Sequence, residues 1–228
     1  MTKNNLILGV SLFFGMLVSP SVYAQTITIG KQVWCKKNLD VSTFNGGDPI
    51  PEAKTNEEWQ YYADNHEPAW CYYDNDPANG IKYGKLYNFF AVNDFRYLAP
   101  TGYHIPSDDE WKILENYLGS SAGKKMKSTS GWGNWSLMDS PKVTPGNGSN
   151  SSGFSGLPGG GRLYYEGFDG VGSHGYWWSS SEYFENDSYT DTGQAWTIGL
   201  GGPDYFYMNP SNKYEGYSVR CIKGGYFD

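Results

Sequence analysis

Hydrophobic and polar residues alternate with a period of two near the start of the chain, over residues 26–29 and again over residues 32–34. The alternating residues include β-branched Thr, Ile and Val, which are typical of half-buried strands. Gly30 and Lys31 separate the two runs and supply a two-residue turn. This pattern predicts a β-hairpin over residues 25–34.

A helical pattern covers residues 107–119. Ser107 and Glu110 have the spacing of a capping box, in which each side chain accepts a hydrogen bond from the backbone N–H of the other residue. Apolar residues then recur on one face of the predicted helix, at Trp111, Leu114 and Leu118. Gly119 ends the pattern, as glycine commonly does after the last helical turn. The acidic residues 108–110 lie at the positive end of the helix dipole, which explains them without a catalytic role.

A second capping box, at Thr55 and Glu58, predicts a short helix that ends near residue 63. Residues 128–161 are rich in Ser, Gly, Asn and Pro and are predicted to be a long irregular stretch. Short aromatic and β-branched runs typical of strands follow, at residues 162–165, 176–179, 195–200, 205–208 and 217–222. We therefore predict an α+β domain with two short helices in its first half and an antiparallel meander after them.

The composition restricts the class of protein. Aromatic residues make up 18% of the 228 residues and charged residues another 18%, and the chain holds 30 Gly and 12 Pro. Disordered chains have few aromatic residues and more charge, so this chain is expected to fold. The net charge of −7 argues against a nucleic-acid-binding domain, which would be basic.

The first 24 residues have the features of a secretory signal peptide. Lys3 provides a positive charge, residues 6–18 form an apolar run, and Val22 and Ala24 are small residues at the expected positions before a cleavage site at Gln25. The apolar run is shorter than the roughly 20 residues that cross a bilayer. We expect residues 25–228 to form a single exported domain without a membrane span, in the periplasm, on the cell surface or outside the cell.

Familiar catalytic motifs are missing from the sequence. Residues 170–175 match the pattern GxGxxG, but residues typical of a strand follow them, where a dinucleotide site needs a helix. The three histidines, His66, His104 and His174, lie far apart and lack the spacing of a zinc site. We therefore predict no catalytic residue and no cofactor, apart from calcium at one turn.

That turn is oxygen-rich and contains Asp74, Asn75 and Asp76. Carboxylate and amide oxygens are calcium ligands, so Asp74 and Asp76 are candidate metal ligands. The spacing departs from that of an EF-hand because Pro77 and Ala78 intervene. The sequence favours the alternative, a plain turn in which the Asp and Asn side chains bond their own backbone.

Residues 179–214 combine many aromatic residues with Ser, Asn, Asp and Gly. Tyr and Trp offer large rigid contact areas, and Ser, Gly and Asn offer adaptable hydrogen bonds, a mixture typical of binding surfaces. The alternative is that alternate aromatic residues fill the core of the meander. The predicted ligand-binding residues are Tyr183, Tyr189, Tyr205, Tyr207, Asn209, Asn212 and Tyr214.

Several segments, in order along the chain, resemble the Fibrobacter succinogenes major paralogous domain. Residues 102–111, Gly-Tyr-His-Ile-Pro-Ser-Asp-Asp-Glu-Trp, are similar to the family pattern G-W-H-V-P-[ST]-x-x-E-W. Supporting motifs are GKQVW at 30–34, YGKLYNFFAV at 83–92, LPGG at 157–160, GYWWSS at 175–180 and GYSVRC at 216–221. The resemblance covers residues 27–223.

That family is similar in turn to the sulfatase-modifying, formylglycine-generating-enzyme-like domains, which have the C-type-lectin-like fold. The resemblance implies two short helices, twisted antiparallel strands and long loops. It also implies that the first and last strands pair, which would bring Trp34 close to Arg220. Four tryptophans of the motif segments would then belong to the core framework, namely Trp34, Trp111, Trp177 and Trp178.

The sequence also departs from these families. Their members often carry a cysteine where this chain has Ala99, so the resemblance leaves Cys35 as an alternative disulfide partner of Cys221. The oxidising enzymes use a pair of active-site cysteines, and the C-type lectins use EPN, QPD or WND motifs to bind sugars through calcium. This chain has no counterpart of either, so neither chemistry is expected here.

We therefore expect an exported, non-enzymatic binding or adhesion module whose partner is a glycan or a protein on another surface. Two alternatives stay open. One is an enzyme of the sulfatase-modifying or glycan-hydrolysing type; for hydrolysis, which needs two carboxylates, Glu166, Asp169 and Glu182 are candidates. The other is a structural subunit of a surface assembly, which would need an unpaired strand edge.

Overall fold

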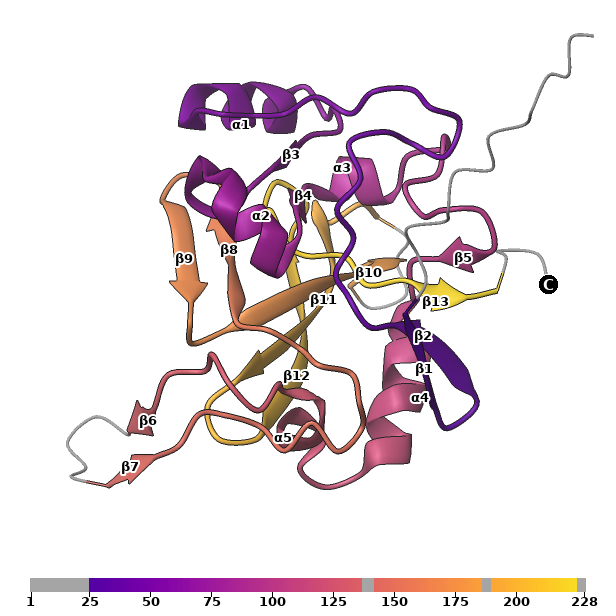
Figure 1. Cartoon of the computed structure of the whole chain (residues 1–228). Helices are drawn as coiled ribbons and strands as arrows, with labels where there is room; N and C mark the ends of the chain where they lie inside the picture. The colour runs from indigo at the N-terminus through magenta and orange to yellow at the C-terminus, as the bar shows by residue number, and fades with distance from the viewer. Residues whose placement is uncertain (1–24, 137–141, 186–189, 225–228) are drawn as a thin grey trace, which may run out of the picture.

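The computed structural model describes residues 25–136, 142–185 and 190–224. The predicted signal peptide lies outside the described residues. Within them, a four-stranded sheet, a five-stranded sheet, two short strand pairs and five α-helices form an α+β architecture (Figure 1). None of the helices in these ranges has both the length and the apolar character that a membrane crossing requires.

The four-stranded sheet joins the two ends of the described chain. Its order is β1 (Thr26–Ile29), β2 (Gln32–Cys35), β13 (Ile222–Lys223) and β5 (Tyr103–His104). The predicted hairpin is confirmed, because β1 and β2 pair in antiparallel register across the turn at Gly30. Ile222 pairs with Trp34, so the last strand pairs with β2, the second strand of the N-terminal hairpin, and not with β1, the first strand.

Both predicted helices are present. The helices α1 (Asn56–Asp64) and α4 (Asp108–Leu118) begin directly after Thr55 and Ser107, and both capping boxes are formed. Three shorter helices and a 3₁₀ turn were not predicted from the sequence, namely α2 (Pro77–Tyr83), α3 (Phe89–Val92), α5 (Ala122–Met126) and η1 (Tyr73–Asn75). Each has seven residues or fewer, too short for an apolar period to stand out. The helix α5 also corrects the expectation that all helices lie in the first half.

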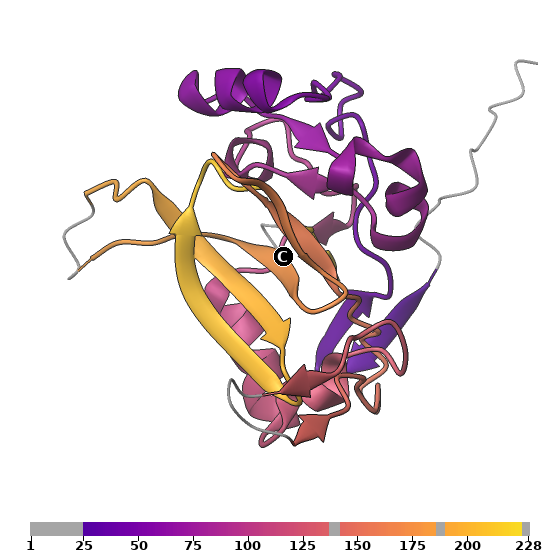
Figure 2. The same cartoon turned by 90° about the vertical axis from the view of Figure 1, so that its left-hand side faces the viewer.

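The five-stranded sheet has the order β12-β11-β10-β8-β9. Its strands are β8 (Gly159–Leu163), β9 (Gly167–Val171), β10 (Gly175–Glu182), β11 (Gln194–Gly201) and β12 (Tyr205–Asn212). The predicted all-antiparallel meander is wrong at one point: β8 and β10 are parallel and meet at a single residue pair, Gly160 with Gly175. The parallel pairing arises because β9 runs antiparallel along one edge of β8, and the chain then crosses to the other edge of β8, where β10 runs in the same direction as β8. Figure 2 shows β8–β9 (orange) and β11–β12 (yellow) as two separate arms.

Two further predictions need correction. The stretch 128–161 is not wholly irregular, because it contains β6 (Trp135–Ser136) and β7 (Val143–Thr144), which pair with each other, and the first residues of β8. The predicted strand at 217–222 is reduced to β13, and the residues before it form isolated bridges. A second short pair, β3 (Trp70–Cys71) with β4 (Leu86–Tyr87), lies below α1.

The core covers both faces of β10 and β11. Because side chains alternate along a strand, Trp177 and Ile198 face α4 and α5, whereas Trp178 and Ala195 pack on the opposite side. The four tryptophans assigned to the framework are fully buried, at 0% exposure: Trp34, Trp111, Trp177 and Trp178. Their predicted place in the core is confirmed.

A buried guanidinium connects the N-terminal and C-terminal segments. Nε and Nη2 of Arg220 donate to Oδ1 of Asn38 at 3.0 and 2.7 Å. Nη1 donates to the carbonyl oxygens of Cys35 and Phe154 at 3.1 and 2.7 Å. The same Oδ1 of Asn38 accepts the indole N–H of Trp177 at 2.9 Å. Burial lowers the pKa of Arg220 to about 9, which leaves the group cationic at neutral pH.

We expect Asn38→Ala to lower the free energy of unfolding by about 3–5 kcal/mol, because it removes the acceptor of a buried charged donor. Urea denaturation measures the loss. The control is Asn209→Ala, at an exposed position of β12, which should change stability by less than about 0.5 kcal/mol. A loss below about 1 kcal/mol for Asn38→Ala would contradict the central role of this amide.

Candidate functional site

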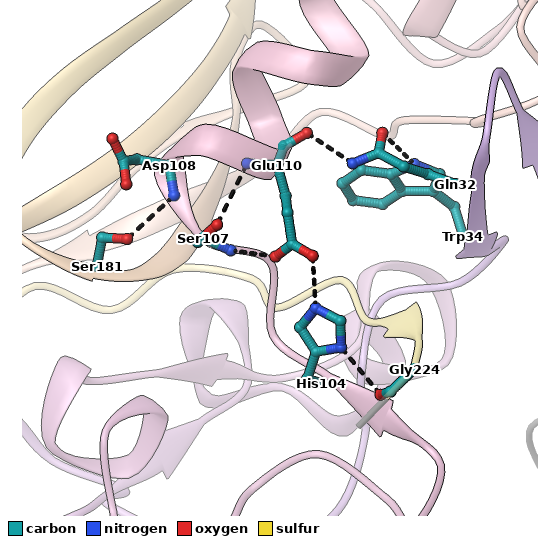
Figure 3. A network of polar contacts seen from close by, with 8 residues as sticks. All are labelled: Gln32, Trp34, His104, Ser107, Asp108, Glu110, Ser181 and Gly224. Atoms are coloured by element: carbon teal, nitrogen blue, oxygen red, sulfur yellow. Dashed lines mark hydrogen bonds and ion pairs between the residues drawn. The ribbon is translucent and has the colours of Figure 1, made fainter. Parts of the chain in front are cut away.

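The motif at residues 102–111 forms a polar network at the start of α4 (Figure 3). The Glu110 carboxylate accepts the backbone N–H of Ser107 at 2.8 Å and lies 2.8 Å from Nε2 of His104. Nδ1 of His104 lies 2.9 Å from the carbonyl oxygen of Gly224. The network therefore fixes α4 against β5 and the residue that follows β13.

The same network reaches β2 and β10. Nε2 of Gln32 donates to the carbonyl oxygen of Glu110 at 2.8 Å, and the backbone N–H of Asp108 donates to Oγ of Ser181 at 3.1 Å. Burial alone would raise the pKa of Glu110, but hydrogen bonds from His104 and Ser107 hold it below its ordinary value. Glu110 is thus an ionised structural group, and the most specific motif of the sequence belongs to the framework.

The edge strand β12 carries three of the predicted binding residues on one face. Tyr205, Tyr207 and Asn209 are odd-numbered and share that face because side chains alternate along a strand. Phe206 and Met208 point the other way and pack against the core beside α4 and α5. The period of two along β12 thus separates exposed or half-buried residues on one face from core-packed residues on the other.

Tyr207 is held in place by its neighbours on the sheet. Its ring lies over Gly199, its partner on β11, where an added Cβ would come within 2.1 Å of Cζ of Tyr207. Its hydroxyl is hydrogen-bonded to Tyr176 on β10, whose ring centroid lies 5.1 Å from that of Tyr217. Burial raises the pKa of all three phenols, so they are neutral and can both donate and accept hydrogen bonds.

We call Tyr176, Tyr207 and Tyr217 the tyrosine cluster. Its polar contacts continue along the sheet, because Tyr217 is hydrogen-bonded to Ser211, whose Oγ lies 2.9 Å from Oγ1 of Thr197. Tyr176 and Tyr207 are half-buried, whereas Tyr217 is 6% exposed. The cluster therefore presents aromatic surface and phenol hydroxyls from a rigid support.

Glu215 lies between the tyrosine cluster and a second aromatic group. Its Oε2 accepts the backbone N–H of Tyr164 at 2.9 Å, and its charge acts on Tyr217. Burial, reinforced by the negative charge of Glu166, raises the pKa of Glu215 to about 7 in spite of that hydrogen bond. A carboxyl group with this pKa is able to donate or accept a proton near neutral pH.

The second aromatic group, here the Tyr214 group, consists of Tyr214, His66, Phe90 and Tyr164. The ring of Tyr214 lies 5.1 Å from that of Tyr164 and 5.9 Å from that of His66. Nε2 of His66 is 3.2 Å from the Tyr214 hydroxyl, and the Tyr164 hydroxyl bonds the carboxylate of Asp64 at the end of α1. Tyr214 is thus one of several aromatic residues brought together from distant segments.

A buried lysine positions the loop that carries Tyr214. Nζ of Lys213 lies 2.7 Å from the carboxylate of Asp191 and 3.2 Å from that of Glu182. Oδ1 of Asn212 accepts the backbone N–H of Tyr214 at 3.0 Å. Asn212, predicted as a ligand contact, therefore shapes the loop, and Glu182, a candidate carboxylate for hydrolysis, is engaged in an ion pair.

The remaining predicted binding residues do not converge on one place. Tyr183 packs against Trp196, with ring centroids 5.1 Å apart. Tyr205 is 51% exposed and lies 6.0 Å from the ring of Trp135. Tyr189 lies outside the described residues.

Sequence reasoning missed Tyr176, Tyr217 and Glu215 as site residues. The two tyrosines lie in motifs that the resemblance assigns to the framework, so the partial exposure of Tyr176 and its contact with Tyr217 gave no separate signal. The alternation along β12 was present in the sequence and would have grouped Tyr207 with Ser211. The raised pKa of Glu215 comes from burial by distant segments, which a local pattern does not encode.

The predicted calcium ligands lie in η1 and at the start of α2. Oδ1 of Asp76 caps α2 by accepting the backbone N–H of Ala78 at 2.9 Å, and Asp74 has a left-handed backbone with φ of 55°. In the parts of the chain that the structure describes, no three His, Cys, Asp or Glu side chains are grouped to hold a metal. The calcium site stays a prediction, and the cap gives Asp76 a structural role.

Cys35, Cys71 and Cys221 are free thiols in the structure. The backbone N–H of Cys35 donates to the carbonyl oxygen of Cys221 at 2.9 Å, so the two residues of the predicted bridge are cross-strand neighbours. Burial raises the pKa of both thiols, which favours the protonated form and slows their reactions without preventing them. The disulfide stays a prediction.

A family model described as Fibrobacter succinogenes major domain matches residues 27–223. The matched range contains the tyrosine cluster, Glu215 and the Tyr214 group. No curated protein and no solved structure matches the chain.

We expect Glu215→Gln to stabilise the protein at pH 8 and to leave its stability unchanged at pH 4. The folded-state pKa of about 7 lies above the ordinary value of 4.5, so the stability of the unsubstituted protein falls as the pH rises from about 4.5 to 7. The expected gain at pH 8 is on the order of 1–2 kcal/mol after allowance for solvent screening. Urea denaturation at both pH values measures it.

The control is Glu67→Gln, at an exposed position, which should shift stability equally at pH 4 and pH 8. Equal stability of Glu215→Gln and the unsubstituted protein at pH 8 would contradict the burial of a charged carboxylate at this position.

Proposed function

We propose that this chain, which belongs to the Fibrobacter succinogenes major domain family, is a binding module for a glycan or a protein surface. The tyrosine cluster would be the contact surface, with Glu215 and the Tyr214 group beside it. The observation that carries the proposal is a pair of hydrogen-bonded, partly exposed tyrosines, Tyr176 and Tyr207, on the sheet strands β10 and β12, with the buried ring of Tyr217 packed beside them. Aromatic residues with polar tips are favoured at binding surfaces because they combine contact area with hydrogen bonding.

The chemistry of the cluster favours a glycan over a protein. Aromatic ring faces pack against the C–H faces of sugar rings, while neutral phenols and a carboxyl group serve the sugar hydroxyls. The strands β10, β11 and β12 already hold the rings in place, so little conformational entropy is lost when a ligand binds.

We further propose a C-type-lectin-like fold and an exported location. Pairing of β2 with β13, at the two ends of the described chain, supports the fold. The signal-peptide features of residues 1–24 support export. The net charge of −7 supports a partner other than nucleic acid.

Hydrolysis of a glycan is the second candidate function, and Glu215 is the observation that favours it. Glycosidases use one carboxyl group with a raised pKa as the general acid and a second, ionised carboxylate. Glu215 would supply the acid. Asp169, whose charge acts on Tyr176 in the cluster, would be the candidate for the ionised carboxylate.

A role in a surface assembly stays a third proposal. The strand β12 lies at the edge of its sheet and could accept another strand. Pro210 within β12 lacks a backbone N–H, and proline on an edge strand opposes such pairing. This proposal therefore has less support than the binding module.

The test of the binding proposal is a glycan array on the purified protein, followed by calorimetry with the strongest glycan. Tyr207→Ala should weaken binding by at least about tenfold, because it removes a central aromatic contact. Tyr207→Phe keeps the ring and should lose less. Tyr117→Ala removes a tyrosine that is 65% exposed on α4 and should leave the affinity unchanged. Equal affinities for Tyr207→Ala and Tyr117→Ala would exclude the tyrosine cluster as the binding site.

The same glycan distinguishes binding from hydrolysis. For a binding module, the protein leaves the glycan intact, and Glu215→Gln retains most of the affinity. For a hydrolase, the protein releases shorter products, and Glu215→Gln binds the glycan but releases none. Chromatography of the glycan after incubation measures both outcomes.

A further inference from the structure

A cavity of about 540 Å³ opens beside the loop that follows β2. Residues 35–41 and 80–84 form two of its walls, and Leu157, Arg220 and Cys221 contribute to the rest. Its volume is within the range of about 300–1,000 Å³ that is typical of small-ligand sites. The cavity shares no residue with the tyrosine cluster or with the Tyr214 group.

Positive charge is concentrated around this cavity. Four cationic side chains line it, those of Lys36, Lys37, Lys82 and Arg220. One carboxylate, that of Asp40, also lines it, but it is already paired with Lys85 at 2.7 Å. The chain as a whole has 24 acidic and 17 basic residues, so the local sign is opposite to that of the protein.

Arg220 is the buried part of this charge. It is 1% exposed, and the acceptors of its hydrogen bonds are neutral: the amide oxygen of Asn38 and two backbone carbonyl oxygens. These contacts use four of the five guanidinium N–H groups, and among the described residues no carboxylate forms an ion pair with Arg220. A buried charge without a counter-charge is costly, and an anion in the cavity would reduce that cost.

Apolar side chains complete the lining. Leu39, Val41 and Leu157 lie on the walls, and Ile81 is 91% exposed while lining the same cavity. A cavity lined by both apolar side chains and lysines suits a ligand that has an apolar part as well as a charge. Inorganic anions would leave this apolar surface unused.

We propose that the cavity binds a small organic anion, with its charged group toward Arg220 and the lysines and its apolar part against Leu39, Val41 and Leu157. Carboxylate, sulfonate and phosphate-ester compounds share this chemistry. The cavity is separate from the tyrosine cluster, so the proposal of an anion site can be tested independently of the proposed function.

The probe is 8-anilinonaphthalene-1-sulfonate, a fluorescent organic anion with an apolar body. We expect saturable binding to the purified, folded protein, and we expect the affinity to fall as salt is added because charges attract the probe. The matched neutral probe is N-phenyl-1-naphthylamine, which lacks the sulfonate and should bind at least about tenfold more weakly.

The decisive variant is Lys36→Gln/Lys37→Gln/Lys82→Gln, which removes three charges from the cavity and leaves the buried core intact. It should bind the anionic probe at least about tenfold more weakly than the unsubstituted protein. The control variant is Lys31→Gln/Lys54→Gln/Lys223→Gln, which removes three exposed lysines that do not line the cavity. It should bind the anionic probe with the affinity of the unsubstituted protein. Circular dichroism verifies that both variants are folded.

A second variant and a chemical readout place the probe. Ile81→Glu adds a negative charge at a highly exposed position and should weaken binding without affecting the fold. Cys35 lines the cavity and is half-buried, so bound probe should slow its alkylation by iodoacetamide under reducing conditions, as measured by mass spectrometry.

Three results would overturn the proposal. The first is equal affinity of the cavity variant and the lysine control for the anionic probe. The second is equal affinity of the unsubstituted protein for the anionic and neutral probes. The third is the absence of saturable binding by the unsubstituted protein.

Discussion

A guanidinium group taken out of water needs hydrogen-bond acceptors for its N–H groups, and this requirement organises the fold. Arg220 meets it with the side chain of Asn38 and with the carbonyl oxygens of Cys35 and Phe154. These acceptors come from segments far apart in sequence, so the charge is satisfied only when the two ends of the domain and its middle meet. The pairing of β2 with β13 places Cys35 beside Cys221, the residue next to Arg220.

Asn38 connects the buried Arg220 to the candidate binding surface. The amide oxygen that serves Arg220 also accepts the indole N–H of Trp177, which fixes β10 relative to the N-terminal segment. The strand β10 carries Tyr176 on its other face and pairs with β11, which in turn supports Tyr207 over Gly199. The buried charge of Arg220 is therefore connected to the tyrosine cluster in steps: through Asn38 to β10, and then through the pairing of β10 with β11 and of β11 with β12.

Local physics explains what the sequence could predict. The caps at Thr55 and Ser107 and the turn at Gly30 depend on residues within a few positions, and their elements form as expected. The parallel contact between β8 and β10 depends on how β9 folds back, and no local pattern specifies it. The candidate site shows the same difference. Alternation along the strand places Tyr207 on one face of β12. The surroundings of Glu215 come from Tyr164, 51 residues earlier, and those of Tyr214 include His66, 148 residues earlier, so no local pattern specifies them.

Because β8 and β10 meet at a single residue pair, the five-stranded sheet consists of two parts, β8–β9 and β10–β12, that are weakly joined at this boundary, here called the seam. Few backbone hydrogen bonds resist separation there, so thermal opening of the native state should begin along this line. The tyrosine cluster spans the seam, because Tyr176 belongs to β10 while the ring of Tyr217 covers Gly161 of β8. A ligand bound across these rings would hold the two parts of the sheet together. Binding would then raise the resistance of the domain to mechanical unfolding.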